Sequence, residues 1–256
     1  MFTLPSQPQT IGETLDTGFK LYFKSFKSIF FISLIMNCLW LINGLVFGPE
    51  IIKSEMQPND VVKIFALIFS ILLVYLIFQV AIIHRINNFA NNNSVSTNES
   101  FQLGFKLFFP MVLATILNSL ILMVGFILLI IPGIALAIYL MLFPIAMVTE
   151  STGPLDSLQR SMDLVKQNWW RSMLIVTVVM IVYSILYSVV GLGFGITVAI
   201  NPPEDINDYA FIFDMVGAII GTILAPLAFS MLIALFNDLK IRREGGDLEA
   251  RLDEMD

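Results

Sequence analysis

The sequence predicts an all-α integral membrane protein: six transmembrane helices in three parallel repeats, each an amphipathic elbow helix followed by two spans. Three observations lead to this prediction: the composition, the lengths of the uncharged runs, and a phrase that occurs twice. Hydrophobic residues make up 57% of the 256 residues and charged residues only 13%, whereas a soluble domain has about 25% charged residues. With a mean hydropathy of +0.84, this composition indicates that lipid surrounds most of the chain.

The long uncharged runs predict the spans. A membrane-spanning helix needs about 20 predominantly apolar residues, and four of the five long runs supply one helix each. The run 107–149 is long enough for two helices, with Ile131-Pro132-Gly133 as a turn signal near its middle. We therefore expect six spans, approximately at 28–48, 62–84, 110–131, 133–149, 172–199 and 211–237.

The basic residues predict the orientation. With six spans, 12 of the 14 Lys and Arg residues lie on one side of the membrane, and only Lys53 and Lys63 lie on the other. The positive-inside rule then places both termini in the cytoplasm. The segment 201–214, on the opposite side, has four acids and no base. The first 27 residues have no small-residue cleavage site, so we do not expect a signal peptide.

An amphipathic helix is predicted before the first span. In the phrase ETLDTGFKLYF, Glu13–Phe23, apolar residues recur at helical spacing and charged residues occupy the opposite face. The phrase ESFQLGFKLFF, Glu99–Phe109, repeats this pattern, and residues 154–169 give a fainter third copy. We expect each copy to lie in the headgroup plane. The apolar face consists of Leu15, Phe19, Tyr22, Phe101, Phe105, Phe108, Leu158, Met162 and Trp169.

Each amphipathic helix precedes two spans, and this order predicts the domain organisation. The repeats cover about 9–84, 96–149 and 154–237. Because each repeat begins and ends on the cytoplasmic side, the three have parallel topology, unlike the inverted repeats of many transporters. We expect residues 1–238 to form one six-span membrane domain and residues 239–256 to form a charged cytoplasmic tail.

The stretch Ile130–Arg171 contains Pro132-Gly133, Pro144 and a helix with Ser157, Arg160 and Ser161. With these features it resembles the signature of the YciC family of uncharacterised bacterial inner-membrane proteins. More distantly, it resembles the membrane domain attached to some glycerophosphodiester phosphodiesterases. The resemblance is strong over about residues 64–171. It implies a location in the inner membrane of a bacterium and brings no settled activity.

No motif predicts catalysis. A glycerophosphodiesterase domain needs acidic metal ligands and histidine acid/base groups in a soluble domain, whereas this chain has one histidine, His84. No GxSxG or HExxH sequence occurs, and GLGFG at 191–195 follows no strand. The single cysteine, Cys38, excludes an intramolecular disulfide. We therefore expect no enzymatic activity, cofactor or metal site, and the lack of a basic patch argues against nucleic acid as a partner.

Polar and small residues within the spans are candidates for a role. Neutral amides at mid-span usually bond between helices, but Asn37, Gln79 and Asn118 can instead line a polar cavity. Small residues four apart in sequence allow helices to approach closely. We expect such packing at Gly191, Gly195, Gly217 and Gly221.

Three classes of function remain open. The sequence favours a non-enzymatic protein that organises or binds membrane lipids or other membrane proteins. Pro144 and Pro226 interrupt their helices and free backbone carbonyls, so they can open a groove to lipid. The second class is a transporter or channel for a small or amphiphilic substrate, with Asn37, Asn118 and the proline kinks along its path. The third, an intramembrane enzyme, has no candidate nucleophile, base or metal ligands.

Overall fold

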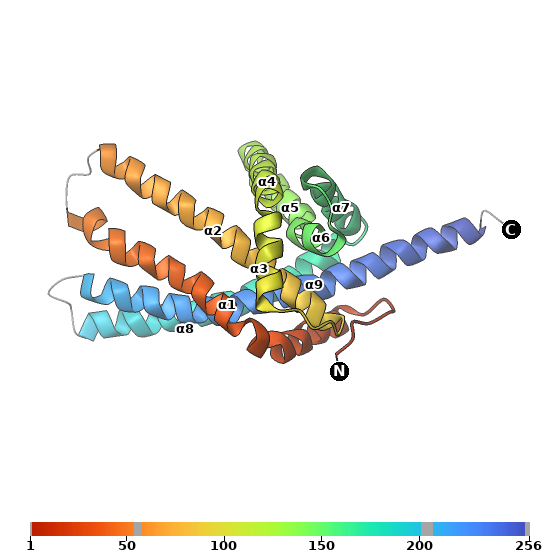
Figure 1. Cartoon of the computed structure of the whole chain (residues 1–256), viewed down its shortest axis with the longest axis horizontal. Helices are drawn as coiled ribbons and strands as arrows, with labels where there is room; N and C mark the ends of the chain where they lie inside the picture. The colour runs from red at the N-terminus through yellow and green to blue at the C-terminus, as the bar shows by residue number, and fades with distance from the viewer. Residues whose placement is uncertain (1, 54–57, 201–206, 254–256) are drawn as a thin grey trace.

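The computed structural model describes residues 2–53, 58–200 and 207–253 (Figure 1). Within these ranges the chain forms helices and no strand. In order, the helices are α1 (Ile11–Lys53), α2 (Pro58–Ala90), α3 (Thr97–Lys106), α4 (Phe108–Leu128), α5 (Ile130–Leu140), α6 (Phe143–Glu150), α7 (Pro154–Lys166), α8 (Trp169–Ile200) and α9 (Asn207–Asp253).

Six helical stretches of the described chain are long and apolar enough to cross a membrane. This finding confirms the predicted all-helical class with six long apolar helices, and it indicates a multi-pass membrane protein. The six stretches are Ile11–Leu39, Val61–Ala90, Phe108–Leu128, Ile130–Glu150, Trp169–Ile200 and Asp214–Gly245.

The first and last helices form the most extensive helix pair. α1 contacts α9 more than any other described element does (Figure 1). Pro226 lacks an N–H, so the carbonyl of Thr222, four residues earlier, loses its helical partner. The hydroxyl of Ser33 in α1 donates to this carbonyl at 2.9 Å. The prediction that Pro226 frees a carbonyl is therefore correct, and α1 satisfies that carbonyl.

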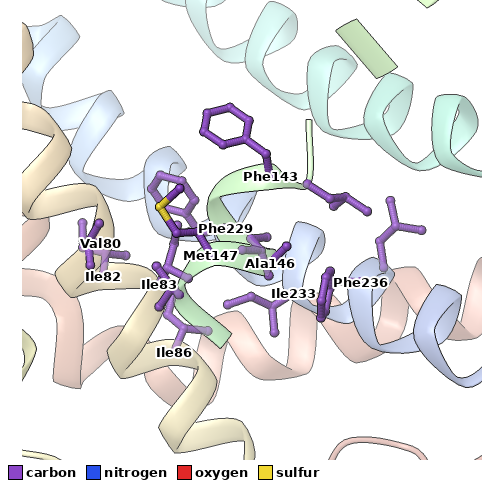
Figure 2. Packing of buried hydrophobic residues seen from close by; sticks show 14 of the residues in the cluster. Val80, Ile82, Ile83, Ile86, Phe143, Ala146, Met147, Phe229, Ile233 and Phe236 are labelled. Carbon is purple, nitrogen blue, oxygen red and sulfur yellow. The ribbon is translucent and has the colours of Figure 1, made fainter. Parts of the chain in front are cut away.

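The short helix α6 lies in the centre of the hydrophobic core. Every residue from Phe143 to Val148 is buried. Figure 2 shows Ala146 and Met147 of α6 between Ile83 of α2 and Ile233 of α9. The other helices, in contrast, expose many large apolar side chains.

The fourth predicted span, 133–149, is not one helix but two. The break lies at Met141 and Leu142, between α5 and α6. Pro144 lies in the first turn of α6, where its missing N–H costs little. In a continuous helix the same proline would remove a hydrogen bond, so it does not favour a continuation of α5. The hydroxyl of Ser161 in α7 donates to the carbonyl of Tyr139 at 2.7 Å and accepts from the N–H of Leu142 at 3.0 Å. A single serine thus satisfies two backbone groups at the break.

The turn between α4 and α5 also differs from the prediction. It lies at Leu129, which has extended backbone angles (φ −168°, ψ 157°), and not at Ile131-Pro132-Gly133. Pro132 is in the first turn of α5, where a helix tolerates proline because its first N–H groups have no helical partner. The Pro-Gly pair therefore begins a helix here.

The first amphipathic segment is not a separate helix, contrary to the prediction. α1 continues without a break from Ile11 to Lys53, so this segment and the first span are one helix. The other two copies do form short helices of their own, α3 and α7. At the other end of the chain, α9 continues to Asp253, so the described part of the predicted tail extends the last helix.

Candidate functional site

A groove of about 570 Å³ lies between α2, α4 and α6. We call it the α2–α4 groove. Its volume is in the range of small-molecule and lipid sites in proteins. No residue that lines it is charged, and most are apolar. The apolar lining includes Phe69, Leu72 and Leu76 of α2, Leu120 and Met123 of α4, and Phe143 of α6.

Two polar atoms on the α4 wall of the groove lack a hydrogen-bond partner among the described residues. They are the side-chain carbonyl oxygen Oδ1 of Asn118 and the hydroxyl oxygen Oγ1 of Thr115, and both are buried. Residues three apart in a helix lie on the same face. An unpaired buried polar atom costs about 1–3 kcal/mol, so both groups would gain from a partner. Both atoms are closed off from the empty groove, so a bound molecule can satisfy them only if the side chains turn toward it.

The structure brings together two of the three residues predicted to line a polar cavity. Gln79 of α2 and Asn118 of α4 both line the α2–α4 groove. Asn37 of α1 lines a separate pocket of about 80 Å³, and its amide donates to the carbonyl of Ser33 at 2.8 Å. Tyr75 lines both cavities.

Proline positions one wall of the groove. Pro144 lines the α2–α4 groove together with Phe143, at the start of α6. Because α5 ends at Leu140 and α6 turns into the core, the side chains at this break face the groove from the protein interior. Of the two prolines expected to open a groove to lipid, Pro144 lines the α2–α4 groove. Pro226 does not line this groove.

The glycines predicted to mediate helix packing divide into two groups. A Cβ atom placed on Gly221 would collide with the side-chain amide of Asn37, so α9 approaches α1 closely here and a larger residue would make Asn37 move. A Cβ atom on Gly191, Gly195 or Gly217 would have no neighbour within 4 Å. The packing prediction is wrong for these three in the described structure, because their faces of α8 and α9 do not meet another helix closely.

The apolar face of the first amphipathic segment packs against α9. Tyr22 is buried in a cluster with Leu224 and Met231 of α9, and Leu15 and Phe19 pack against the same cluster. The prediction of a membrane-facing stripe is therefore wrong for Tyr22. The physical reason is the unbroken α1 helix, which presents this stripe to α9.

The second segment contains both packed and exposed residues. The ring of Phe101 stacks edge-on against Phe78 of α2, with centroids 5.1 Å apart, and Phe108 is partly buried. Phe105 is 65% exposed. Its side chain is thus free of the protein and available to a membrane surface.

The third segment also contains both buried and exposed residues. Leu158 of α7 is buried, which contradicts its prediction as a membrane-facing residue, whereas Met162 is 41% exposed. Trp169, at the start of α8, is partly buried, and its indole N–H donates to the carbonyl of Ala135 at 3.5 Å. This face of α7 turns inward because α7 packs on α4, α5 and α6.

A buried ion network that the sequence analysis did not identify joins three segments at one end of the molecule. Asp238 of α9 is 1% exposed, and its Oδ2 accepts from the Nε of Arg171 at 2.8 Å and from the Nε of Arg242 at 3.0 Å. Its Oδ1 accepts from the backbone N–H of Gln9 at 2.7 Å. Both arginines also donate to the carbonyl of Gln9. The segment before α1 is thereby fixed to α8 and α9.

A second network lies near the first. Arg160 of α7 donates to both carboxylate oxygens of Glu150, at 2.8 and 2.9 Å, and Lys240 of α9 pairs with the same carboxylate at 2.9 Å. The hydrogen bond to Glu150 raises the pKa of the Arg160 guanidinium above its usual value. The sequence contains the signal for this network, in that its acids and bases flank the spans, but it does not show which of them pair.

The single histidine links two helices. Its Nδ1 lies 3.2 Å from the hydroxyl of Ser100, so His84 connects α2 to α3. Among the described residues, no group of three or more His, Cys, Asp or Glu side chains is placed to hold a metal ion.

Residues 54–201, more than half of the chain, match the family model of an uncharacterised protein family, UPF0259. Searches of the curated proteins and of the solved structures gave no match. The matched region runs from α2 to the end of α8 and so contains the three helices that form the α2–α4 groove. The chain therefore belongs to the uncharacterised protein family UPF0259.

Proposed function

We propose that this protein is a non-enzymatic, multi-pass protein of the bacterial cytoplasmic membrane that binds a lipid or a similar amphiphile in the α2–α4 groove. The observation that carries the proposal is the groove itself, about 570 Å³ in volume, uncharged, and lined by two helices of candidate-span length. A site of this kind suits a hydrocarbon chain, because apolar burial supplies binding energy without charged partners.

The position of the groove supports a ligand from the bilayer. Its walls come from the candidate spans Val61–Ala90 and Phe108–Leu128. Leu72, Leu120 and Met123, which line it, are each at least half exposed. In a membrane such exposed side chains face acyl chains, so a lipid can enter the groove sideways without crossing water.

The location of the charged networks supports the proposed orientation. The basic residues of these networks lie in segments that the positive-inside rule assigns to the cytoplasm. They are Arg160 in α7, Arg171 at the start of α8 and Lys240 in the part of α9 after the predicted span 211–237. Ionic groups are costly within hydrocarbon. This end of the molecule therefore belongs at the inner surface, with both termini in the cytoplasm.

Equivalent residues support the proposal of three parallel repeats. Thr10 and Glu13 cap the start of α1 through reciprocal hydrogen bonds of 2.7 and 3.3 Å, and Ser96 and Glu99 cap α3 in the same way at 3.0 and 3.1 Å. Both pairs form the capping box that favours a helix start. The third copy begins with Gly153 instead and has no side-chain cap.

The buried positions of the three copies also correspond. A small polar residue, fully buried, occurs one turn after each start, and a second small residue follows four positions later. At the second position, a Cβ atom on Gly18 would lie 3.1 Å from the Cα of Met231, and a Cβ atom on Gly104 would lie 2.8 Å from the carbonyl oxygen of Ile77. The matched pairs are Thr14 with Gly18, Ser100 with Gly104, and Ser157 with Ser161.

One observation favours a transporter as the second candidate function. Tyr75 separates the α2–α4 groove from the pocket at Asn37, because it lines both cavities. Movement of this ring would connect Asn37 with Asn118 and create a polar path between α1, α2 and α4. Replacing Tyr75 with Ala would then increase the flux of an amphiphile across vesicles, whereas a binding protein would show no flux.

The lipid-binding proposal is tested with two matched variants. Leu120 and Leu113 lie on α4 and are each 50% exposed, but only Leu120 lines the groove. We expect Leu120→Trp to fill the groove and reduce the lipid that copurifies in mild detergent, measured per protein by native mass spectrometry. Leu113→Trp should retain the wild-type amount. Equal retention in both variants, or a wild-type protein without bound lipid, would contradict the proposal.

A further inference from the structure

We infer that the α2–α4 groove selects an uncharged, long-chain amphiphile that ends in a hydroxyl group. Once the two side chains turn toward the groove, the hydroxyl would donate a hydrogen bond to Oδ1 of Asn118 and accept one from the hydroxyl of Thr115. This inference rests on the proposed function, and it adds the chemistry of the bound group. The observation behind it is the pair of buried oxygen atoms without partners on the wall of an otherwise apolar groove.

The two side chains require complementary partners. The Oδ1 atom of Asn118 is a hydrogen-bond acceptor, so it needs a donor. The hydroxyl of Thr115 can donate, and it makes no bond to a carbonyl in the preceding turn of its own helix, unlike Thr177 and Thr222 in the other spans. A hydroxyl group carries one donor and can accept at the same oxygen, so a single group satisfies both side chains.

The depth of the pair argues against a charged head group. Asn118 lies ten residues after the start of α4 at Phe108, which corresponds to about 15 Å along the helix axis. This is about half of the 30 Å hydrocarbon thickness. No charged side chain lines the groove, and an unpaired charge at this depth is costly. A phosphate or carboxylate therefore does not suit the site, whereas a neutral hydroxyl does.

The length of the groove accommodates a hydrocarbon chain beside the hydroxyl site. On α2 the lining extends from Phe69 to Gln79, and on α4 from Val112 to Met123. At about 1.5 Å per residue, each wall is roughly 15 Å long. Asn118 and Thr115 lie in the middle of the α4 wall, so roughly 7 Å of groove lies on either side of the hydroxyl. The groove would hold the first part of the chain, and the rest would continue past its end along the exposed apolar side chains.

The test compares two probes, hexadecanol and its methyl ether. The ether can accept a hydrogen bond but cannot donate one. Binding of each deuterated probe to the full-length protein in detergent is measured by mass spectrometry. One hydrogen bond in a protein is worth about 0.5–1.5 kcal/mol, so we expect the wild type to bind the alcohol roughly twofold to tenfold more tightly than the ether.

Variants test the contribution of each side chain to the binding of the two probes. Asn118→Leu should bind both probes equally, with the affinity for the ether unchanged within about twofold. Thr115→Val, which keeps the shape of the side chain, should weaken the binding of both probes by a similar factor and keep the preference for the alcohol, because alcohol and ether can both accept from the Thr115 hydroxyl. It provides a second reading if Asn118→Leu folds poorly. Ser119→Ala is the control, because Ser119 lines the same groove but is exposed. It should keep the wild-type preference.

The outcomes separate the two proposals. If the wild type binds alcohol and ether equally, the buried pair is satisfied by water or does not meet the ligand, and this inference fails while lipid binding stands. If the wild type binds neither probe, the proposed function itself fails. If Asn118→Leu keeps the preference for the alcohol, or if Thr115→Val leaves the affinity for both probes unchanged, the hydroxyl binds elsewhere and the inference is overturned.

Discussion

Asp238 shows how one buried carboxylate can organise the end of a helical membrane protein. It is 1% exposed and lies between two guanidinium groups, so neither its charge nor theirs is left alone in a poorly hydrated place. Its second oxygen holds the backbone N–H of Gln9. A buried charge without a partner is strongly destabilising. We therefore expect the stability of the protein to be more sensitive to a change at Asp238 than to a change at an exposed charged residue.

Asp238→Asn should therefore destabilise the protein. Two arginines would face a neutral amide, and breaking a buried ion pair typically costs about 3–5 kcal/mol. The matched control is Asp16→Asn, because Asp16 pairs with Lys20 on the exposed surface of α1 and such pairs contribute less than about 1 kcal/mol. Aggregation midpoints in detergent provide the measurement. Similar midpoints for the two variants would show that the network does not stabilise the folded protein.

At the scale of the element, one amphipathic pattern produces different structures. The first copy is continuous with its span and packs against α9, whereas α3 and α7 are short helices with one face packed and one exposed. Helical periodicity indicates that one face is apolar, but it does not distinguish lipid from a neighbouring helix as the partner of that face. Tyr22 and Phe105 illustrate the two outcomes.

For α3 we expect hydrophobic contact to outweigh charge. Phe105 is 65% exposed and its neighbour Lys106 is also exposed. Transfer of a Phe side chain to an apolar environment is worth about 1.5–3 kcal/mol, whereas a Lys near anionic lipid gains about 1 kcal/mol. Phe105→Asp should therefore lower membrane abundance, measured by quantitative immunoblot, more than Lys106→Gln does. If the Lys change were the more damaging one, α3 would be an ionic docking site for a cytoplasmic partner.

At the scale of the whole molecule, the six long apolar helices fix an even number of crossings if each spans the membrane once. The two ends of the chain are then on the same side. The structure agrees with this arrangement in one respect, because Gln9, before α1, contacts Arg242, in the charged part of α9 that follows the predicted span 211–237. Segments that touch each other outside the spans lie at the same membrane surface.

Reporter fusions test this topology. A reporter placed after Arg251 should give a cytoplasmic signal, and one inserted near Asp205 should give a signal from the outer face. The physical reason is that 12 of the 14 basic residues lie on the side assigned to the cytoplasm. An outer signal from the Arg251 fusion would mean an odd number of spans and would also contradict the three-repeat proposal.

The sequence predicts the spans well because they depend on local composition, and it predicts the pairing poorly because pairing depends on distant residues. Uncharged runs locate α2, α4 and α8 within a few residues. The break at Met141 and Leu142 is less predictable, because Ser161 satisfies it from another helix. Asn118 and Gln79 are recognisable as mid-span amides, but only the fold shows that they line one groove and that Asn37 does not.

The pairing of α1 with α9 has a consequence for how the protein is made. The hydroxyl of Ser33 donates to the carbonyl of a residue that lies 189 positions later in the chain. At about 5–20 residues per second, the ribosome needs roughly 10–40 seconds to supply that residue. During this interval the face of α1 that carries Tyr22 and Ser33 has no α9 to cover it. A nascent chain is therefore incomplete in its interior until its last helix is inserted, and a protease or insertase that recognises an uncovered first helix would distinguish unfinished copies from finished ones.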